Sequence, residues 1–179
     1  MVYLFLADGF EEVEALTPLD MLRRAQVPVT TVGIGGEYIR GAHDIVVKAD
    51  ISAADIDFND LTAVILPGGM PGTLNLDKSD DVQRAIAYAT ENDLTVAAIC
   101  AAPSILGHGG YLSGRNATCF PGFEDELLGA ELSDEPLVWD GNILTAKGAG
   151  VALDFAFELV KRLVSDEKSA EIRGAIQCR

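Results

Sequence analysis

Short apolar segments alternate with helical segments along most of this chain, and this alternation limits the fold more than any other feature. Four uncharged segments have the composition of buried strands, at residues 2–7, 27–34, 63–66 and 94–99. Shorter strands are predicted at residues 116–119, 137–139 and 143–146, and a hairpin-like excursion at residues 38–47. Helical spacing of apolar residues predicts helices at residues 11–26, 80–91, 100–106, 150–164 and 167–176. Strands that are apolar on both faces need helices on both sides, so we expect an α/β fold, a three-layer sandwich with a mostly parallel central sheet.

No repeat, low-complexity stretch or linker divides the 179 residues, so we expect a single domain over residues 1–179. Lys and Arg number 13 against 28 Asp and Glu, and the net charge is −15. This charge repels phosphate backbones and anionic lipid, which excludes nucleic-acid binding by a basic face. The apolar run at residues 2–7 is too short for a membrane span or a signal peptide, so we expect no membrane partner.

The cysteines and histidines are few and widely spaced. Three cysteines, Cys100, Cys119 and Cys178, are an odd number and form no disulfide framework, which favours a reducing cytoplasm. No CxxC or HExxH spacing occurs, and His43 and His108 are the only histidines. We therefore expect no metal site.

Ligands of parallel α/β sheets bind at the carboxyl ends of the strands. Three predicted strands end at Asp8-Gly9, at Pro67-Gly68-Gly69 and at Cys100, so these residues should meet at one edge of the sheet. Cys100 lies between a strand and a helix and is flanked by alanines, the context of a nucleophile elbow. A thiol at a helix N-terminus should have a lowered pKa. The alternative interpretation is a buried core cysteine.

Two further features could assist such a nucleophile. The Gly68-Gly69 turn could direct backbone N–H groups at a developing negative charge, although it also fits an ordinary tight turn. Acidic residues at positions 11, 12 and 14 begin a predicted helix, where solvated acids are common. Glu14 differs, because it lies among apolar residues. A carboxyl group buried there should have a raised pKa and could donate a hydrogen bond to a thiolate.

The remaining polar candidates are weaker. His108 lies eight residues after Cys100 and, at about 1.5 Å per helical residue, is too distant to act as its base. His43 falls in the hairpin-like excursion and is expected at the surface or an interface. Cys119 is a candidate resolving thiol for oxidised Cys100, with a buried structural cysteine as the alternative.

Several stretches together resemble the DJ-1/ThiJ/PfpI superfamily, in particular its DJ-1-like branch. They are Gly-Phe-Glu-Glu-Val-Glu at residues 9–14, Leu-Pro-Gly-Gly at 66–69, Ala-Ala-Ile-Cys-Ala-Ala-Pro at 97–103, and Ile-Leu-Thr and Lys-Gly-Ala-Gly within 143–150. The likeness extends from about residue 2 to residue 165, with the motifs in the family's order. It implies a flavodoxin-like sandwich, a homodimer, and no cofactor.

The resemblance also implies roles for individual residues. Cys100 would be the oxidisable nucleophile, Glu14 its buried carboxyl partner, and Gly69 and Ala101 the backbone donors of an oxyanion hole. Members of the family are described as glyoxalases or deglycases that act on small 2-oxoaldehydes and early glycation adducts, and others as oxidative-stress sensors or chaperones. Gly68, Phe120 and Pro121 would line the site.

Two positions depart from the family pattern. Ala101 stands where the protease-like branch has a histidine, so peptidase activity is not expected. Phe120-Pro121 replaces a His-Pro segment of the DJ-1 prototype, which removes a proton-transfer group from the site. The sequence therefore favours a cysteine-dependent glyoxalase or deglycase. The alternatives are a redox sensor whose Cys100 is oxidised to sulfenic or sulfinic acid with little turnover, and a binding module without chemistry.

Overall fold

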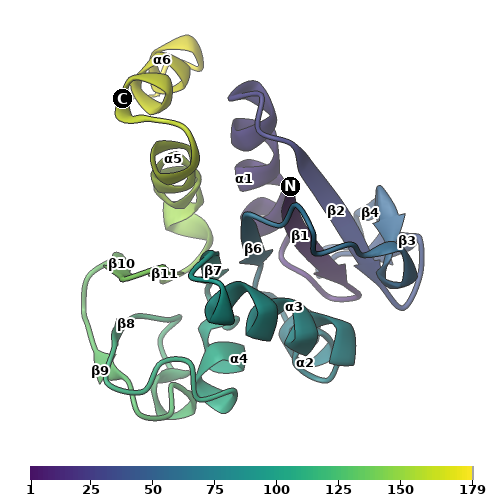
Figure 1. Cartoon of the computed structure of the whole chain (residues 1–179), viewed down its shortest axis with the longest axis vertical. Coiled ribbons are helices and arrows are strands. Elements are labelled where there is room, and N and C mark those ends of the chain that lie inside the picture. Colours follow the sequence, from purple (N-terminus) through teal and green to yellow (C-terminus); the bar gives the residue numbers. More distant parts are fainter. Residues whose placement is uncertain (179) are drawn as a thin grey trace.

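A seven-stranded sheet forms the centre of the protein in a computed structural model that describes residues 1–178 (Figure 1). The strands lie in the order β10-β11-β7-β6-β1-β2-β5. Every neighbouring pair is parallel except β10 and β11. Their bounds are β1 Val2–Ala7, β2 Val29–Ile34, β5 Ile51–Ser52, β6 Ala63–Leu66, β7 Thr95–Ile99, β10 Leu137–Asp140 and β11 Ile143–Ala146. The predicted α/β fold with a mostly parallel sheet is confirmed.

The three central strands, β1, β6 and β7, are buried along their whole length. This burial explains why they read as continuous apolar runs, since helices cover both of their faces. Val2 pairs with Ala63, and Val64 with Val96, so the carboxyl ends of the three strands reach the same edge of the sheet.

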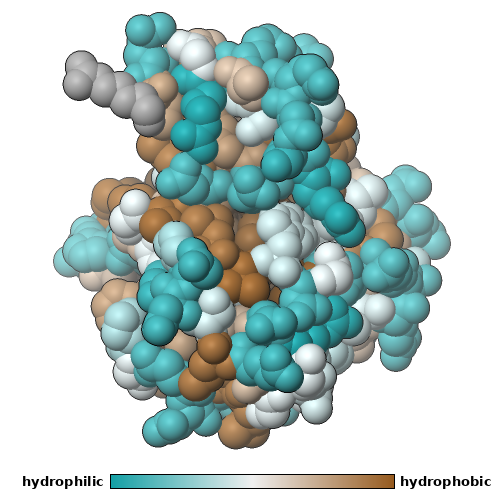
Figure 2. Space-filling view, turned by 90° about the vertical axis from the view of Figure 1, so that its left-hand side faces the viewer, coloured by the Kyte–Doolittle hydropathy of each residue, from teal (hydrophilic) through white to brown (hydrophobic). Residues whose placement is uncertain are grey.

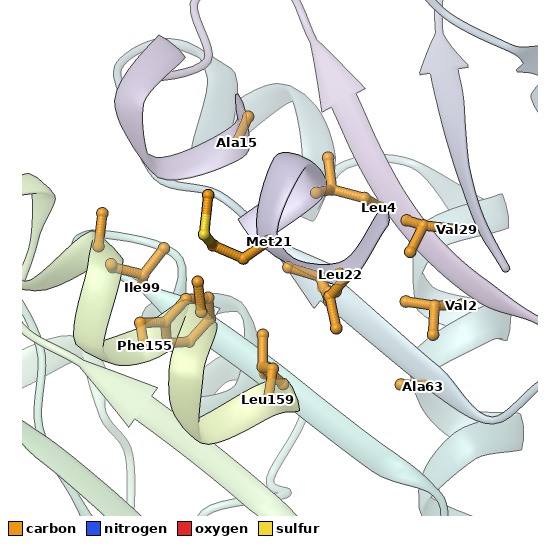
Figure 3. Close-up of a cluster of buried hydrophobic side chains, with 14 of the residues drawn as sticks. Val2, Leu4, Ala15, Met21, Leu22, Val29, Ala63, Ile99, Phe155 and Leu159 are labelled. Atoms are coloured by element: carbon orange, nitrogen blue, oxygen red, sulfur yellow. The ribbon is translucent and has the colours of Figure 1, made fainter. Parts of the chain in front are cut away.

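Helices form a layer on each side of the sheet (Figure 1). One layer consists of α1 Glu12–Arg24, α5 Ala152–Leu163 and α6 Asp166–Ala175. The other consists of α2 Gly72–Asp77, α3 Asp80–Glu91 and α4 Pro103–His108. On the first side, Met21 and Leu22 of α1 meet Phe155 and Leu159 of α5 above the sheet (Figure 3). These contacts hold α1, which carries Glu14, against the strand ends.

Shorter strands and helical turns lie around this core. The hairpin-like excursion is confirmed, because β3 Tyr38–Arg40 pairs antiparallel with β4 Val46–Lys48. Only β8 Asn116–Ala117 of the strand predicted at 116–119 forms, and it pairs with β9 Glu131–Leu132 outside the main sheet. Single turns of 3-10 helix occur at Ala53–Asp55, Glu124–Glu126 and Ala149–Val151. The sequence prediction missed α2, β5 and β9, which are too short for a periodic signal.

Within residues 1–178, no helix combines the length and the hydropathy that crossing a bilayer requires. Polar side chains cover much of the face in Figure 2, and apolar surface gathers in a band across its middle.

Candidate active site

The three strand ends that the sequence singled out lie together. The Glu11 N–H donates to the Gly68 carbonyl at 2.9 Å, which ties the start of α1 to the turn after β6. Gly69 has a φ of +91°, and a Cβ atom at this position would overlap the backbone of Glu11 and Gly9. A Cβ on Gly68 would lie 2.6 Å from Cys100 Cβ. Gly69 is therefore required by close backbone approach and by its positive φ, and Gly68 by the nearby side chains of Cys100 and Glu14.

Cys100 occupies a strained turn between β7 and α4. Its φ is +65°, a left-handed conformation that is uncommon for a residue with a side chain. The Cys100 N–H donates to the Ala146 carbonyl of β11 at 2.8 Å, which anchors the turn to the sheet. The prediction that this helix begins at residue 100 is wrong, because α4 begins at Pro103. Pro at the first helical position was the signal for this boundary.

Three groups surround the Cys100 sulfur. The backbone N–H groups of Gly69 and Ala101 donate to it, and the thiol donates to the Glu14 carboxylate. Glu14 is only 1% exposed, and its Oε2 also accepts the Gly68 N–H at 3.0 Å. The arrangement brings a nucleophile, a proton acceptor and two N–H donors to one point, which is the set that acyl-type and carbonyl chemistry requires.

The Glu14 carboxyl group has a pKa raised to about 7, chiefly because burial penalises its charged form. The negative charge of Glu11 raises the pKa further, and hydrogen bonds from Cys100, Gly68 and Ala149 oppose the shift. Glu14 can therefore gain or lose a proton near neutral pH, which suits a proton shuttle.

The Cys100 thiol has a pKa raised to about 12, through burial first and then through the charge and hydrogen bond of Glu14. The prediction that a helix dipole lowers the Cys100 pKa is wrong. The six-residue α4 starts beyond Cys100, and the Gly69 and Ala101 N–H groups only partly offset the burial. Glu14 must therefore accept the thiol proton when the sulfur attacks, or carry it so that the sulfur is already a thiolate.

Phe120 and Pro121 lie at the mouth of this site. The Phe120 N–H donates to the Cys100 carbonyl at 2.8 Å, while its side chain remains 47% exposed. A Cβ on Gly148 would lie 3.2 Å from Phe120 Cδ2 and 3.7 Å from Glu14 Oε1. The Phe120 ring and Glu14 therefore face the same loop, at residues 147–151.

The Cys119 side chain packs in a different part of the core from Cys100, although the next residue, Phe120, bonds the Cys100 carbonyl. Cys119 is 4% exposed and belongs to the core on the α3 and α4 side, whereas Cys100 packs against the core on the α1 and α5 side. Burial raises the Cys119 pKa to about 11. No disulfide joins these two residues. Cys119 borders a cavity of about 290 Å³ that Thr118, Glu124 and Lys147 also line.

Both histidines pair with carboxylates away from the sulfur. His108 bonds Asp77 through Nδ1 at 2.9 Å and Glu126 through Nε2 at 2.8 Å, which joins the ends of α2 and α4 to the segment after Phe120. His43, with a side chain 68% exposed, bonds Glu12 through Nδ1 at 2.8 Å. Glu12 was expected to be a solvated cap, but it is buried because the loop at residues 41–45 covers it.

Glu11, Glu12 and His43 are the described group that could hold a metal ion, with donor atoms within 4.8 Å of one another. Glu12 already accepts hydrogen bonds from the His43 backbone N–H at 2.8 Å and from the His43 ring. The three side chains therefore satisfy one another as an ion-pair network without a metal.

The backbone N–H of Ala149 donates to Glu14, a contact that sequence reasoning missed. The segment that carries it, residues 147–150, resembles the family in sequence, but the resemblance implies no role for it in the site. It follows β11, which runs beside β7 in the sheet. Strand order was the missing information, because the neighbours of β7 cannot be read from the order of segments in the chain.

Comparisons with known proteins agree with this geometry. The DJ-1/PfpI family model matches residues 1–162. The chain is 34% identical to protein dj-1beta of Drosophila melanogaster over 170 residues, covering 93% of this chain and 91% of that protein. A crystal structure of a DJ-1 superfamily protein from Salmonella typhimurium superposes with a TM-score of 0.94 at 33% identity, covering 98% of this chain and 97% of that one. The structure of oxidized DJ-1 from Toxoplasma gondii superposes with a TM-score of 0.94 at 28% identity, covering 98% and 97%. This chain belongs to the DJ-1/PfpI family.

Proposed function

We propose that the protein is a cysteine-dependent, cofactor-independent glyoxalase or deglycase that converts small 2-oxoaldehydes, or their early adducts with thiols and amines, to 2-hydroxy acids. The observation that carries the proposal is the surroundings of the Cys100 sulfur, which contacts the Glu14 carboxyl group and the N–H groups of Gly69 and Ala101. Nothing in the reaction requires an external oxidant or reductant, since one carbon of the substrate is oxidised while its neighbour is reduced.

The reaction begins when the Cys100 sulfur adds to the aldehyde carbon and Glu14 takes the thiol proton. The aldehyde oxygen becomes an oxyanion within reach of the two N–H donors, which are already in place and need no rearrangement. Because the pKa of Glu14 is about 7, its protonated form can return the proton to this oxygen to give a hemithioacetal.

The second stage moves hydrogen between the two substrate carbons. Glu14 removes the hydrogen of the former aldehyde carbon, and an enediol forms as the neighbouring ketone oxygen is protonated. Glu14 then takes the hydroxyl proton of the former aldehyde carbon and a proton is delivered to the neighbouring carbon, which gives a thioester of Cys100 with a 2-hydroxy acyl group. Water then cleaves the thioester, releasing the 2-hydroxy acid and the thiol. The sum is one 2-oxoaldehyde and one water consumed for one 2-hydroxy acid.

The direct test follows lactate formation from methylglyoxal with no added cofactor. Wild type and the Cys119→Ser control should form lactate, while Cys100→Ser should form none, because the hydroxyl of serine is a far weaker acid and nucleophile than the thiol of cysteine. Equal lactate formation by Cys100→Ser would contradict the mechanism. If wild type formed no lactate, the next substrate to test would be the adduct of methylglyoxal with a thiol or an amine. An adduct that stayed intact in the presence of the protein would exclude the deglycase reaction too.

The second candidate function is a redox sensor, and Phe120 is the observation that favours it. A phenyl ring stands where a proton-transfer histidine is expected from the family resemblance, so Glu14 would have to move every proton alone. In this alternative, the oxygen of an oxidised Cys100 would be held by the Gly69 and Ala101 N–H groups and by Glu14. Peroxide treatment followed by intact mass distinguishes the two.

We propose that two copies of this chain form a homodimer in a reducing cytoplasm. An apolar surface formed by α1, the start of α5 and the loop before β4 supports the dimer. Val13, Ile45 and Leu153 are each at least 40% exposed there and border one shallow cavity together with Leu16. Exposed apolar patches of this kind commonly mark contacts between proteins.

A further inference from the structure

A shallow groove of about 290 Å³ adjoins the Cys100 site, and the proposed reaction assigns it no role. Its walls are almost entirely apolar and are formed by Phe120, Pro121 and residues 147–151. Phe120 is the aromatic residue of these walls, and 47% of it is exposed.

Two residues that line the groove also form hydrogen bonds with the catalytic residues. Phe120 is held by its own N–H to the Cys100 carbonyl, and Ala149 donates its N–H to Glu14. Gly148 lies between them, because a Cβ there would approach Phe120 Cδ2 to 3.2 Å and Glu14 Oε1 to 3.7 Å. An aldehyde carbon on the sulfur would therefore have its substituent next to the Phe120 ring.

We propose that this groove receives the substituent of the 2-oxoaldehyde and that Phe120 makes the protein prefer substrates with an aromatic or branched apolar group over methylglyoxal. The inference rests on the proposed function and names its substrate class. A methyl group is too small to cover the ring, whereas a phenyl or isopropyl group would remove apolar surface of both partners from water. A single methylene in an apolar pocket is worth about 10- to 200-fold in kcat/KM, so we expect the larger groups to be preferred by at least about tenfold.

Phenylalanine at position 120, in place of the histidine of the family pattern, then contributes to substrate binding. A polar imidazole would interrupt the apolar wall between Pro121 and Ala149, and phenylalanine makes that wall continuous. The substitution reduces the proton-transfer groups of the site to Glu14 but extends the surface that recognises the substrate.

The kinetic test compares kcat/KM for phenylglyoxal and methylglyoxal, measured as initial rates of mandelate and lactate formation. Wild type should prefer phenylglyoxal by at least about tenfold, and Phe120→Ala should bring the two values within about threefold of each other. Gly36→Ala is the matched control, because that residue lies in open space away from the site and should keep the wild-type ratio. Equal kcat/KM values for the two aldehydes in wild type would overturn the proposed role of the groove in substrate preference, while the proposed function would remain intact.

A binding measurement decides the inference even without turnover. Cys100→Ser protein is titrated calorimetrically with mandelate and with lactate, which differ only in the group that the groove would hold. Mandelate should bind at least about tenfold more tightly, and adding Phe120→Ala should remove the difference. Equal binding of the two acids would overturn the inference. If wild type turned over neither aldehyde but mandelate still bound tightly, the proposed function would fail and the apolar subsite would remain.

Discussion

The Glu14 carboxyl group accepts a hydrogen bond from the Cys100 thiol inside the protein, and its Oε2 atom accepts the Gly68 N–H at 3.0 Å. The two residues come from α1 and from the turn after β7, which are 86 positions apart in the sequence. Because each contributes to the other's pKa shift, the pair titrates as a unit, and its first proton leaves near pH 7.

The rate of Cys100 alkylation by iodoacetamide should rise as the pH increases through about 7. Below that pH, both groups hold a proton and the sulfur has no acceptor; above it, Glu14 can take the thiol proton. Glu14→Gln should abolish this rise, because glutamine does not titrate and cannot take the thiol proton. Glu11→Gln is the matched control, since removing its charge should move the rise to lower pH. A rise in Glu14→Gln identical to that of wild type would exclude Glu14 as the acceptor.

Protein stability should fall as the pH increases from about 4.5 to about 7 on account of Glu14. The folded-state pKa exceeds the unfolded value, so the folded protein binds more protons in this range, and its stabilisation is complete only below the unfolded value. The loss is of the order of 3 kcal/mol for a fully buried carboxyl group. Urea unfolding at pH 5 and pH 8 measures it: Glu14→Gln should gain stability relative to wild type at pH 8. An equal difference between the two proteins at both pH values would contradict the linkage.

Gly69→Ala should lower both the free energy of unfolding and the reactivity of Cys100. The new Cβ would overlap backbone atoms of Glu11 and Gly9, at a φ of +91° that alanine rarely adopts. Strain of this kind costs about 1–3 kcal/mol, and any shift that relieves it moves the N–H away from the sulfur. Gly36→Ala, which meets no atom within 4 Å, is the control for urea unfolding and alkylation. A Gly69→Ala protein with unchanged alkylation would show that this N–H does not assist the sulfur.

His108→Gln should destabilise the protein most below about pH 6.5. Hydrogen bonds to Glu126 and Asp77 raise the His108 pKa, so its stabilisation is complete below the unfolded value and disappears as the pH rises through the folded one. Solvent screening limits the effect to about 0.5–1 kcal/mol. Thermal unfolding between pH 5.5 and 9 checks the trend, and His43→Gln is a control with a more exposed side chain. A difference independent of pH would exclude this ionic contribution.

Peroxide should add oxygen to Cys100 before Cys119, because Cys100 is only partly buried and has N–H donors at its sulfur. Intact mass and peptide mapping of wild type, Cys100→Ser and Cys119→Ser measure the order. Cys119→Ser should oxidise as wild type does. A product of wild type that has lost two hydrogens, absent from both variants, would instead identify Cys119 as the resolving thiol.

Val13→Asp should convert the proposed dimer to monomers, because it places a charge in the apolar surface shared with Ile45 and Leu153. Sedimentation velocity measures the change. Val46→Asp is the control, since that residue is also exposed but does not border this cavity. A monomeric wild-type protein would rule out the dimer.

The amino-acid sequence by itself determined the central strands, the hairpin at β3 and β4, and the meeting of three strand ends. These features follow from local physics: continuous apolar runs must be buried, and parallel strands bring their carboxyl ends to one edge. It also indicated that Glu14 would be buried with a raised pKa, because its neighbours on the helix are apolar.

Only the tertiary structure decided the chemistry around Cys100. Cys100 has a positive φ, and α4 begins only at Pro103, so the thiol does not sit at a helix N-terminus as expected. Burial beside Glu14 raises the thiol pKa instead of lowering it. Likewise, the Ala149 N–H reaches Glu14 because β11 lies beside β7, and Glu12 is buried by a loop about 30 residues away. A pKa and a hydrogen bond depend on which distant groups share a space, and the spacing of residues along a chain does not contain that information.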